Sequence, residues 1–288
     1  MSPVAAAFLL VIPAYREARR LPPFLRELRS TLADFAPGVD ILVVDDGSPP
    51  ADWQALRSIL TAELAAPPTA SPATTPGTAP ASPATTVPTG CCRLLPPLRL
   101  EENTCKGGAI LAGWRQPGPP RWLAFVDADG AVSAREVRRV FTAIHATETR
   151  ADTPGHGTAW FASRAPLRGE NTRVRRTPLR ILSAAAFTGV ARLLLGVRIG
   201  DSQCGFKVVA ASDFLRIENG LRPHGFCFDL ALLLALRRSG VVVHEVPVAW
   251  DEQPHGHLSL RRHCWGILRA LLALRREQRS TSSPGPTP

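Results

Sequence analysis

The sequence predicts an α/β fold in which a single, mostly parallel β-sheet is flanked by helices. Two observations carry this prediction. Within residues 4–148, short apolar runs alternate four times with loops and with segments whose apolar residues recur at helical spacing. The run at residues 122–126 (WLAFV) is apolar throughout, as expected of a strand buried on both faces of a parallel sheet.

The first two strand–helix units lie before residue 65. Residues 4–12 are the first predicted strand, and two prolines suited to the first turn of a helix begin a helix over residues 22–35. Leucines at helical spacing give this helix one face that packs on the sheet. Residues 39–44 are the second predicted strand, and a helix over residues 52–64 follows it.

Residues 65–90 differ from the rest of the chain. Pro, Ala, Thr and Ser dominate this segment, and it contains no charged residue. Such a composition is typical of disorder, so we expect a disordered insertion between two parts of one catalytic domain, residues 1–64 and 91–257. Because the insertion joins a helix to the next strand, it should leave the sheet at the edge opposite the carboxyl ends of the strands. We therefore expect it to be dispensable for chemistry.

The predicted sheet resumes after the insertion. Residues 93–100 read as a strand that two adjacent prolines interrupt, which indicates an irregular or edge position. Residues 103–110 open a helix, and the strand at 122–126 comes next. Ser133 and Glu136 then form a capping box at the start of another helix.

The second half of the chain is less regular. It is expected to contain, in order, a strand at 158–163, an arginine-rich segment from 164 to 180, an apolar helix at about 179–195, a compact polar loop at 200–207, a helix from 228 to about 239, and a strand at 241–246. Residues 258–279 are predicted to form a basic amphipathic helix. Residues 280–288 should be a disordered tail.

Composition limits the classes of function. The chain has 34 Lys and Arg against 24 Asp and Glu, for a formal net charge of +10, which favours a polyanionic neighbour such as a membrane surface or a phosphate-rich substrate. Its six cysteines show no C-x-x-C spacing, so a zinc site is not expected. We find neither a signal peptide nor a charge-free run near the roughly 20 residues of a membrane-spanning helix. We expect a cytoplasmic protein, soluble or peripheral at the inner face of a membrane.

Carboxylates follow the predicted strands where each one ends, at Glu17, Asp45, Asp46, Asp127 and Asp129. Ligands of parallel sheets bind beyond the carboxyl ends of the strands, so these side chains should meet there. Two carboxylates one residue apart repel unless a cation lies between them, and hard divalent ions prefer oxygen ligands. In the simpler alternative, the pair after residue 126 only caps the next helix.

Two familiar nucleotide-binding motifs are missing. The first strand leads into PAYRE and not into a G-x-G-x-x-G turn, and no G-x-x-x-x-G-K-[ST] segment is present. The remaining groups are the carboxylates, Lys106 beside a glycine-rich helix start, and a carboxylate at Asp45 that can accept from a base or from ribose hydroxyls. Together they suit a nucleoside-diphosphate-linked substrate whose leaving diphosphate a metal neutralises.

Five segments resemble glycosyltransferase family 2, in the branch of the dolichyl-phosphate glucosyltransferases and polyprenyl-phosphate mannosyltransferases. They occur in the family's order and are residues 11–17 (VIPAYRE), 43–48 (VVDDGS), 106–110 (KGGAI), 127–130 (DADG) and 201–207 (DSQCGFK). The resemblance covers residues 4 to about 275 apart from the insertion. It implies a GT-A fold, a donor of the UDP-glucose or GDP-mannose type, Mg²⁺ or Mn²⁺, and inversion at the anomeric carbon.

The resemblance also implies roles for individual residues. The nucleotide sugar would be held by Pro13, Tyr15, Glu17, Asp45, Asp46, Lys106 and Asp127. Asp127 and Asp129 would hold the metal, with Asp129 as the principal ligand, and Gln203 would border the sugar. The acceptor phosphate would contact Arg164, Arg176 and Lys207, and the catalytic set would be Asp129, Gln203, Arg164 and Lys207. At residues 255–257 the chain has His-Gly-His where relatives commonly have Gly-Ser-Lys.

Physical chemistry favours a phosphorylated acceptor independently of the family name. A phosphate monoester is largely dianionic at neutral pH, so it can attack the sugar without a general base. The protein then has to align two anions and screen their repulsion, which suits arginines and lysine on one side and a metal on the other. We therefore predict transfer of a hexose, expected to be glucose, to a polyprenyl phosphate in cell-envelope biosynthesis.

Two alternatives remain. A same-fold enzyme with a hydroxyl acceptor would need a carboxylate base, for which Asp201 or Asp229 could serve. The chain could also be a non-catalytic protein that binds a nucleotide sugar or a membrane surface. A nucleic-acid partner is not expected. The arginine-rich segment could be a solvated face, and the C-terminal helix with Trp265 fits an interfacial helix as well as a packing element.

Overall fold

The computed structural model describes residues 6–66, 92–118, 120–148, 157–164, 174–175, 178–197, 200–223, 225–253 and 260–282, although not the side chains of 174–175, 178–186, 226, 260–264 and 279–282. The predicted insertion lies outside these residues from residue 67 to residue 90, and the predicted tail lies outside them from residue 283. Arg176, His255 and His257 also lie outside the described residues.

The described residues form a central sheet of eight strands in the order β3-β2-β1-β5-β8-β6-β9, with β4 also paired to β2. Its strands are β1 (Phe8–Ala14), β2 (Val39–Asp45), β3 (Cys92–Leu94), β4 (Leu98–Arg99), β5 (Trp122–Val126), β6 (Thr158–Ser163), β8 (Phe206–Ala210) and β9 (Val242–Pro247). All neighbours pair in parallel except β8, which runs antiparallel to β5 and β6. A separate parallel pair joins β7 (Val174–Arg175) to β10 (Trp250–Asp251). The predicted mostly parallel sheet is confirmed.

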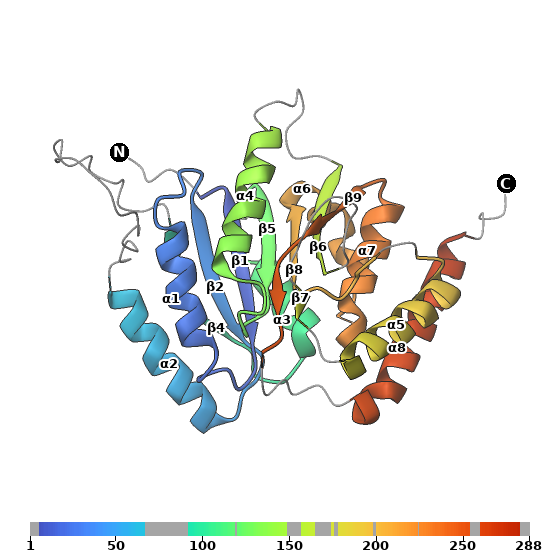
Figure 1. Ribbon diagram of the computed structural model, residues 1–288, viewed down its shortest axis with the longest axis horizontal. Helices are drawn as coiled ribbons and strands as arrows, with labels where there is room; N and C mark the ends of the chain where they lie inside the picture. The colour runs from blue at the N-terminus through green and yellow to red at the C-terminus, as the bar shows by residue number, and fades with distance from the viewer. Residues whose placement is uncertain are drawn as a thin grey trace.

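Helices cover both sides of the sheet. They are α1 (Leu21–Leu32), α2 (Pro50–Ala65), α3 (Cys105–Trp114), α4 (Ala134–Glu148), α5 (Pro178–Leu195), α6 (Ala211–Ile217), α7 (Phe228–Arg238) and α8 (Leu260–Ser282), with short 3₁₀ turns η1 (Glu218–Gly220) and η2 (Gly225–Cys227). In Figure 1, α1 and α2 lie at one side of the sheet, and α5, α7 and α8 lie at the other. The predicted helices are confirmed, with bounds shifted by a few residues.

The continuous apolar run of β1 is explained by two cores. Phe8, Leu10 and Ile12 join a buried cluster with α1 and α4. Leu9 and Val11 point the other way and join a cluster with α3, α7 and α8. Because successive side chains of a strand point to opposite faces, a strand covered by helices on both faces has no polar positions.

The structure corrects the sequence analysis at β8 and α6. Residues 200–207 were expected to form a polar loop, and no strand was predicted after them. The structure places β8 from Phe206 in the interior of the sheet, between β5 and β6, and α6 follows at once. The strand FKVVA was not predicted because Lys207 interrupts its apolar run, and because the strand runs antiparallel to its neighbours, which breaks the strand–helix alternation.

Two smaller expectations are confirmed. The prolines at positions 96 and 97 divide the strand expected at 93–100 into β3 and β4, which both pair with β2. Ser133 caps α4, since its hydroxyl oxygen accepts a hydrogen bond of 3.4 Å from the N–H of Glu136. No helix in the described part of the chain has the length and apolar character needed to span a bilayer.

Candidate active site

The sheet gathers the predicted acidic residues beyond the carboxyl ends of β1, β2 and β5. The last residue of β1, Ala14, pairs with Asp45, and the N–H of Asp46 donates to the carbonyl of Ala14 at 2.8 Å. Asp127 comes directly after β5, which pairs with β1 in parallel. The strand ends therefore lie side by side at one edge of the sheet.

One carboxylate oxygen of Asp45 has no hydrogen-bond partner among the described residues. Its side chain is fully buried, and Oδ2 accepts from the N–H of Ser48 at 3.1 Å and lies 3.9 Å from Nε of Arg99. Oδ1 is buried without a hydrogen-bond partner in the described part of the chain. An unpaired buried acceptor is costly, so a ligand that brings an N–H or O–H donor would relieve it.

Asp46 is already bound to its neighbours. Its Oδ1 accepts from the N–H of Thr104 at 2.7 Å and from the hydroxyl of Thr104 at 2.9 Å, while its carbonyl accepts from the amide of Asn103. Burial raises the pKa of Asp46, and the hydrogen bonds from Thr104 oppose that shift. Asp46 therefore holds the loop that leads into α3.

The loop after β1 presents Tyr15 and Glu17 near the same edge. Tyr15 is 39% exposed, and the guanidinium of Arg16 lies 5.4 Å from the centre of its ring. Glu17 is buried and forms an ion pair with Arg20, whose Nε donates to Oε2 at 2.8 Å. The N–H of Arg16 donates to the hydroxyl of Ser48 at 2.9 Å, which ties this loop to the one after β2. Pro13 is a residue of β1 itself.

Asp127 and Asp129 follow β5. Oδ1 of Asp127 lies 2.7 Å from the ammonium of Lys106, and Oδ1 of Asp129 accepts from the N–H of Ala131 at 3.0 Å. Burial, with a further contribution from the charge of Asp127, raises the pKa of Asp129. The shift means that the ionised form of Asp129 is poorly stabilised by the protein alone, and a bound cation would stabilise it.

A divalent ion fits this pair of carboxylates. Within the described ranges, no group of three or more His, Cys, Asp or Glu side chains could hold a metal. Mg²⁺ is nevertheless commonly bound through one or two carboxylates, with waters and substrate phosphate oxygens as the other ligands. Asp127 and Asp129 supply that donor set, so the residues present suit a metal that arrives with a diphosphate.

Gly205 makes room for the carboxylate of Asp127. A Cβ added at Gly205 would lie 1.9 Å from Oδ2 of Asp127, and the N–H of Asp127 donates to the carbonyl of Gly205 at 2.9 Å. The sequence analysis included Gly205 in a motif but gave it no role. Its only local signal was a glycine immediately before an apolar run.

Lys106 lies in the first turn of α3 between two carboxylates. Its ammonium is 2.7 Å from Asp127 and 3.9 Å from Oδ2 of Asp229. Burial alone would lower the pKa of Lys106, but Asp127 and Asp229 raise it by more, and the net shift is upward. Lys106 is therefore a permanent positive charge beside the predicted metal ligands.

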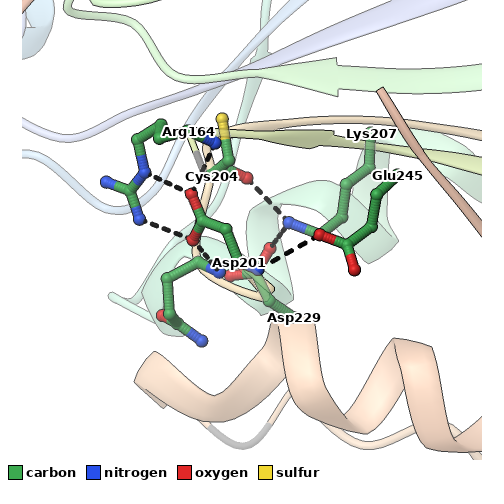
Figure 2. A network of polar contacts seen from close by, with 7 residues as sticks. Arg164, Asp201, Cys204, Lys207, Asp229 and Glu245 are labelled. Carbon is green, nitrogen blue, oxygen red and sulfur yellow. Dashed lines mark hydrogen bonds and ion pairs between the residues drawn. The ribbon is translucent and has the colours of Figure 1, made fainter. Parts of the chain in front are cut away.

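Arg164 is held rigidly at the end of β6. Its Nε and Nη2 donate to the two oxygens of Asp201 at 2.6 and 2.8 Å, and its backbone N–H also donates to Asp201 at 2.9 Å (Figure 2). Its guanidinium lies 5.3 Å from the centre of the Trp250 ring. Burial alone would raise the pKa of Asp201, but the hydrogen bonds and charge of Arg164 lower it to about 2.

Lys207 does not line the surface of the site. Its side chain has no exposed surface, and its ammonium donates to the carbonyl of Cys204 at 2.7 Å and to Oδ1 of Asp229 (Figure 2). The direct phosphate contact expected of Lys207 does not fit this geometry. The expectation assumed a loop, whereas β8 is an interior strand that turns this lysine between the rings of Phe125 and Phe161.

The carboxylates of Asp201 and Glu245 bind backbone N–H groups of the loop at residues 200–205. The N–H of Gln203 donates to Oδ1 of Asp201 at 3.1 Å, and Nε2 of Gln203 is buried without a partner in the described residues. Glu245 of β9 accepts from the N–H of Gly200 at 2.8 Å and from the N–H of Asp201 at 3.3 Å. Sequence reasoning missed Glu245, because it shows no motif and is 44 residues from Asp201.

The chain is similar in sequence to curated glycosyltransferases. No protein-family model matches it. It is 29% identical to the dolichyl-phosphate beta-glucosyltransferase of Saccharomyces cerevisiae, over 57% of this chain and 49% of that protein. It is 26% identical to the enzyme of the same name from Dictyostelium discoideum, over 84% of this chain and 66% of that protein. It is also 29% identical to the polyprenol monophosphomannose synthase of Mycolicibacterium smegmatis over 86% and 78%. The chain thus spans about half to two thirds of the length of the two glucosyltransferases.

Solved structures share its fold. Glucosyl-3-phosphoglycerate synthase from Mycobacterium tuberculosis, in complex with Mn²⁺, UDP and glucosyl-3-phosphoglycerate, has a TM-score of 0.54 and 13% identity over 94% of this chain and 80% of that one. Mannosyl-3-phosphoglycerate synthase from Rubrobacter xylanophilus has a TM-score of 0.53 and 16% identity over 98% and 78%. These likenesses show the fold. The chain is thus similar in sequence to dolichyl-phosphate glucosyltransferases and to a polyprenol monophosphomannose synthase, and it shares the GT-A fold of the solved glycosyltransferases.

Proposed function

We propose that the chain is an inverting, metal-dependent glycosyltransferase that moves a hexose, expected to be glucose, from a nucleoside-diphosphate sugar to a polyprenyl phosphate. The observation that carries the proposal is the meeting of acidic and basic groups at one edge of the sheet. Asp127 contacts Lys106 at 2.7 Å, and its N–H donates at 2.9 Å to the carbonyl of Gly205, in the same loop as the Asp201 that pairs with Arg164. The names of the sequence relatives support the same class of sugar and acceptor.

The nucleotide is proposed to bind over the ends of β1 and β2. The unpaired Oδ1 of Asp45 can accept an N–H of a base or a ribose hydroxyl. The exposed ring of Tyr15 lies on the loop that Ser48 ties to this edge. Both features suit donors of the UDP-glucose and GDP-mannose type, because uracil and guanine each carry an N–H donor.

The diphosphate is proposed to lie near Asp127, Asp129 and Lys106. A divalent cation held by the two carboxylates supplies positive charge that stabilises the departing diphosphate. Asp127 and Asp129 present oxygen ligands for it, and the ammonium of Lys106 adds a positive charge at 2.7 Å from Asp127. Charge arranged before the reaction costs no reorganisation during it.

The acceptor phosphate is proposed to meet Arg164. The ion pair with Asp201 holds this guanidinium in one orientation, and its remaining N–H donor capacity can bind phosphate oxygens. Lys207 and Asp229 are proposed to support the loop that carries Cys204 without contacting the phosphate, and Gln203 is proposed to border the sugar. Arg176 keeps its proposed role in phosphate binding on the family resemblance alone.

A hydroxyl acceptor is less well supported. Such an acceptor needs a carboxylate that is ready to take a proton near neutral pH. The pKa of Asp201 is about 2, and Asp229 is buried with a lysine facing each of its oxygens. Neither residue is suited to act as a base, whereas a phosphate dianion needs none.

Attachment to the inner face of a membrane is part of the proposal. Trp265 of α8 is 72% exposed, and Leu268 and Leu272 on the same helix are exposed as well. Exposed arginines at positions 269 and 276 accompany them. An apolar stripe beside basic residues is typical of a helix that lies in the interface of an anionic bilayer, where a polyprenyl acceptor would be found.

The test is a transfer assay with a lipid product. Purified protein, Mn²⁺ and undecaprenyl phosphate are incubated with radiolabelled UDP-glucose or GDP-mannose, and the organic phase is counted. Label should appear in the lipid phase with one donor, and it should be absent with unphosphorylated undecaprenol. Label in a water-soluble product would favour a hydroxyl acceptor. Nucleotide binding without any turnover would favour the non-catalytic alternative.

A further inference from the structure

Asp229 lies between two lysines at the start of α7. Its Oδ1 accepts from the ammonium of Lys207, and its Oδ2 lies 3.9 Å from the ammonium of Lys106. Lys106 in turn lies 2.7 Å from Asp127. The four side chains therefore form a row of alternating charge, Asp127–Lys106–Asp229–Lys207, that runs from the candidate metal ligands into the interior. Figure 2 shows its inner end.

The inner end of this row is buried and bound on several sides. Lys207 has no exposed surface, and its ammonium also binds the carbonyl of Cys204 at 2.7 Å and lies near the rings of Phe125 and Phe161. A buried ammonium requires a paired charge, so Asp229 is held there through Oδ1. Its second oxygen is left facing Lys106.

The spacing between Lys106 and Asp229 is set by close packing of α3 against α7. A Cβ added at Gly107 would lie 2.7 Å from Cβ of Phe228 and 2.5 Å from the carbonyl of Pro223. Gly107 and Phe228 are the chain neighbours of Lys106 and Asp229. The two helix starts are therefore in direct contact, and the two charged side chains are held beside each other.

The outer end of the row is accessible. The side chains of Lys106 and Asp127 are 30% and 39% exposed. An ammonium has three donors on a flexible stem, so Lys106 can shift between the two carboxylates that it faces. If Asp127 became a ligand of a divalent cation, its contact with Lys106 would compete with the cation, and Asp229 is the nearest described carboxylate that could keep the ammonium neutralised.

We propose that Asp229 is a positioning residue that holds Lys106 beside Asp127 and retains its ammonium when Asp127 binds a divalent cation. Asp229 then acts on the metal only through Lys106. The inference rests on the proposed function in one respect, that Asp127 is a metal ligand. It goes beyond that function because it assigns a role in cation binding to a residue that touches neither metal nor substrate.

The test replaces Asp229 and Lys207 together by uncharged residues. Asp229→Asn combined with Lys207→Met leaves no unpaired buried charge, and a buried ion pair can often be replaced in this way with little loss of stability. Mn²⁺ affinity is measured by electron paramagnetic resonance of the free ion, in the presence of UDP or GDP. The double variant is expected to lose about 10- to 100-fold in Mn²⁺ affinity, the usual effect of removing a partner behind a metal ligand.

Mn²⁺ affinity is then compared with and without the double change in a protein that also carries Lys106→Met. This comparison separates an effect that acts through Lys106 from a general structural effect. Without Lys106, the double change is expected to leave Mn²⁺ affinity unaltered. A loss that persists without Lys106, or wild-type affinity in the double variant, would overturn the proposal. If the double variant does not fold, Asp229→Glu takes its place in the same cycle with the same expected dependence on Lys106.

The outcomes distinguish this proposal from the proposed function. If the wild-type protein fails to bind Mn²⁺ in the presence of UDP and also in the presence of GDP, the inference fails together with the metal site. If a labelled lipid product forms while the double variant keeps its Mn²⁺ affinity, only the role of Asp229 is lost. An Asp229-dependent loss of Mn²⁺ affinity without any transfer product would leave the inference intact and remove the proposed acceptor.

Discussion

At the scale of single residues, Asp127 has a well-defined orientation because its neighbours leave it little space. Lys106 binds one of its oxygens at 2.7 Å, and Gly205 lies so close that a Cβ there would reach Oδ2 at 1.9 Å. A contact that short cannot exist between real atoms, so any larger residue at position 205 must displace the carboxylate or the loop. The absence of a side chain at Gly205 is therefore as important for the site as the carboxylate itself.

We predict that Gly205→Ala lowers transfer activity by about 100-fold, the effect expected when a reacting group is misplaced by about 1 Å. The substitution changes no candidate metal or substrate ligand. The measurement is kcat in the lipid-phase assay, with Mn²⁺ affinity as a second readout. Gly220→Ala is the matched control, because nothing lies within 4 Å of a Cβ added there. Equal activities of the two variants would contradict the prediction.

Asp129 gives a prediction in which stability and activity change in opposite directions. Burial and the charge of Asp127 raise its pKa in the folded protein. The folded state therefore binds the proton more tightly than the unfolded state, whose pKa is about 3.9. The stability linked to this group is greatest below that pH and is lost as pH rises through the folded-state pKa.

We expect Asp129→Asn to raise the melting temperature near pH 7 in EDTA, and we expect the gain to shrink as pH falls toward about 4. Transfer should fall by several kcal/mol of transition-state stabilisation, because the cation loses its principal ligand. Melting curves at a series of pH values check the first part, and the lipid-phase assay checks the second. A variant that is less stable than wild type at pH 7 without metal would show that the carboxylate is not strained.

At the scale of elements, the end of α2 is fixed by Arg29 of α1. Arg29 of α1 donates from Nη1 to the carbonyl of Glu63 and from Nη2 to the carbonyl of Ala66, each at 2.6 Å, and it also forms an ion pair with Glu63. These bonds satisfy carbonyls at the end of α2, which a helix leaves without partners of its own. The chain reaches residue 67 from an anchored position.

We therefore predict that deleting residues 67–89, with a short Gly-Ser linker in their place, leaves the melting temperature within a few degrees and kcat within about twofold, since the entropy of closing a loop changes slowly with its length. Thermal melting and the lipid-phase assay are the measurements. Arg29→Ala serves as the contrasting variant and should lower the melting temperature. A deleted protein that folds but does not turn over would assign the insertion a part in the chemistry.

At the scale of the whole molecule, the net charge of +10 and the exposed face of α8 point to the same partner. Buried Leu271 and Leu274 pack α8 onto the rest of the molecule, while Trp265, Leu268 and Leu272 remain exposed on the same helix. One side of α8 therefore belongs to the core, and another side is available to a lipid surface.

We predict that the protein floats with anionic vesicles at low ionic strength and is released at high salt, because salt screens exposed charges. Changing Trp265, Leu268 and Leu272 together to Ser should abolish flotation and leave the melting temperature unchanged. Leu271→Ala, on the buried side, should leave flotation unchanged and lower the stability of the fold by about 2 to 5 kcal/mol. Flotation that is equal with neutral vesicles, or that resists salt, would contradict an electrostatic attachment.

Local patterns were enough to predict most of the elements and the position of the acidic groups. Strands β1 and β5 show continuous apolar runs because helices cover both faces of the sheet, and α1 and α4 show one apolar stripe each. A carboxylate that follows a parallel strand must lie at the edge where its neighbours also end, so the placement of Asp45 and Asp127 at one edge of the sheet follows from local sequence patterns.

The partners of the charged residues could not be predicted, because they depend on contacts between distant parts of the chain. Arg164 pairs with Asp201 across 37 residues, and Lys207 pairs with Asp229 across 22. No pattern at the period of a helix or strand encodes such pairs. The direction of Lys207 depended on β8, an antiparallel strand inserted into the sheet by long-range pairing, which turned an expected surface charge into a buried support. Local sequence patterns thus determined which edge of the sheet carries the acidic groups, and long-range packing decided which charged side chains are buried and which are exposed.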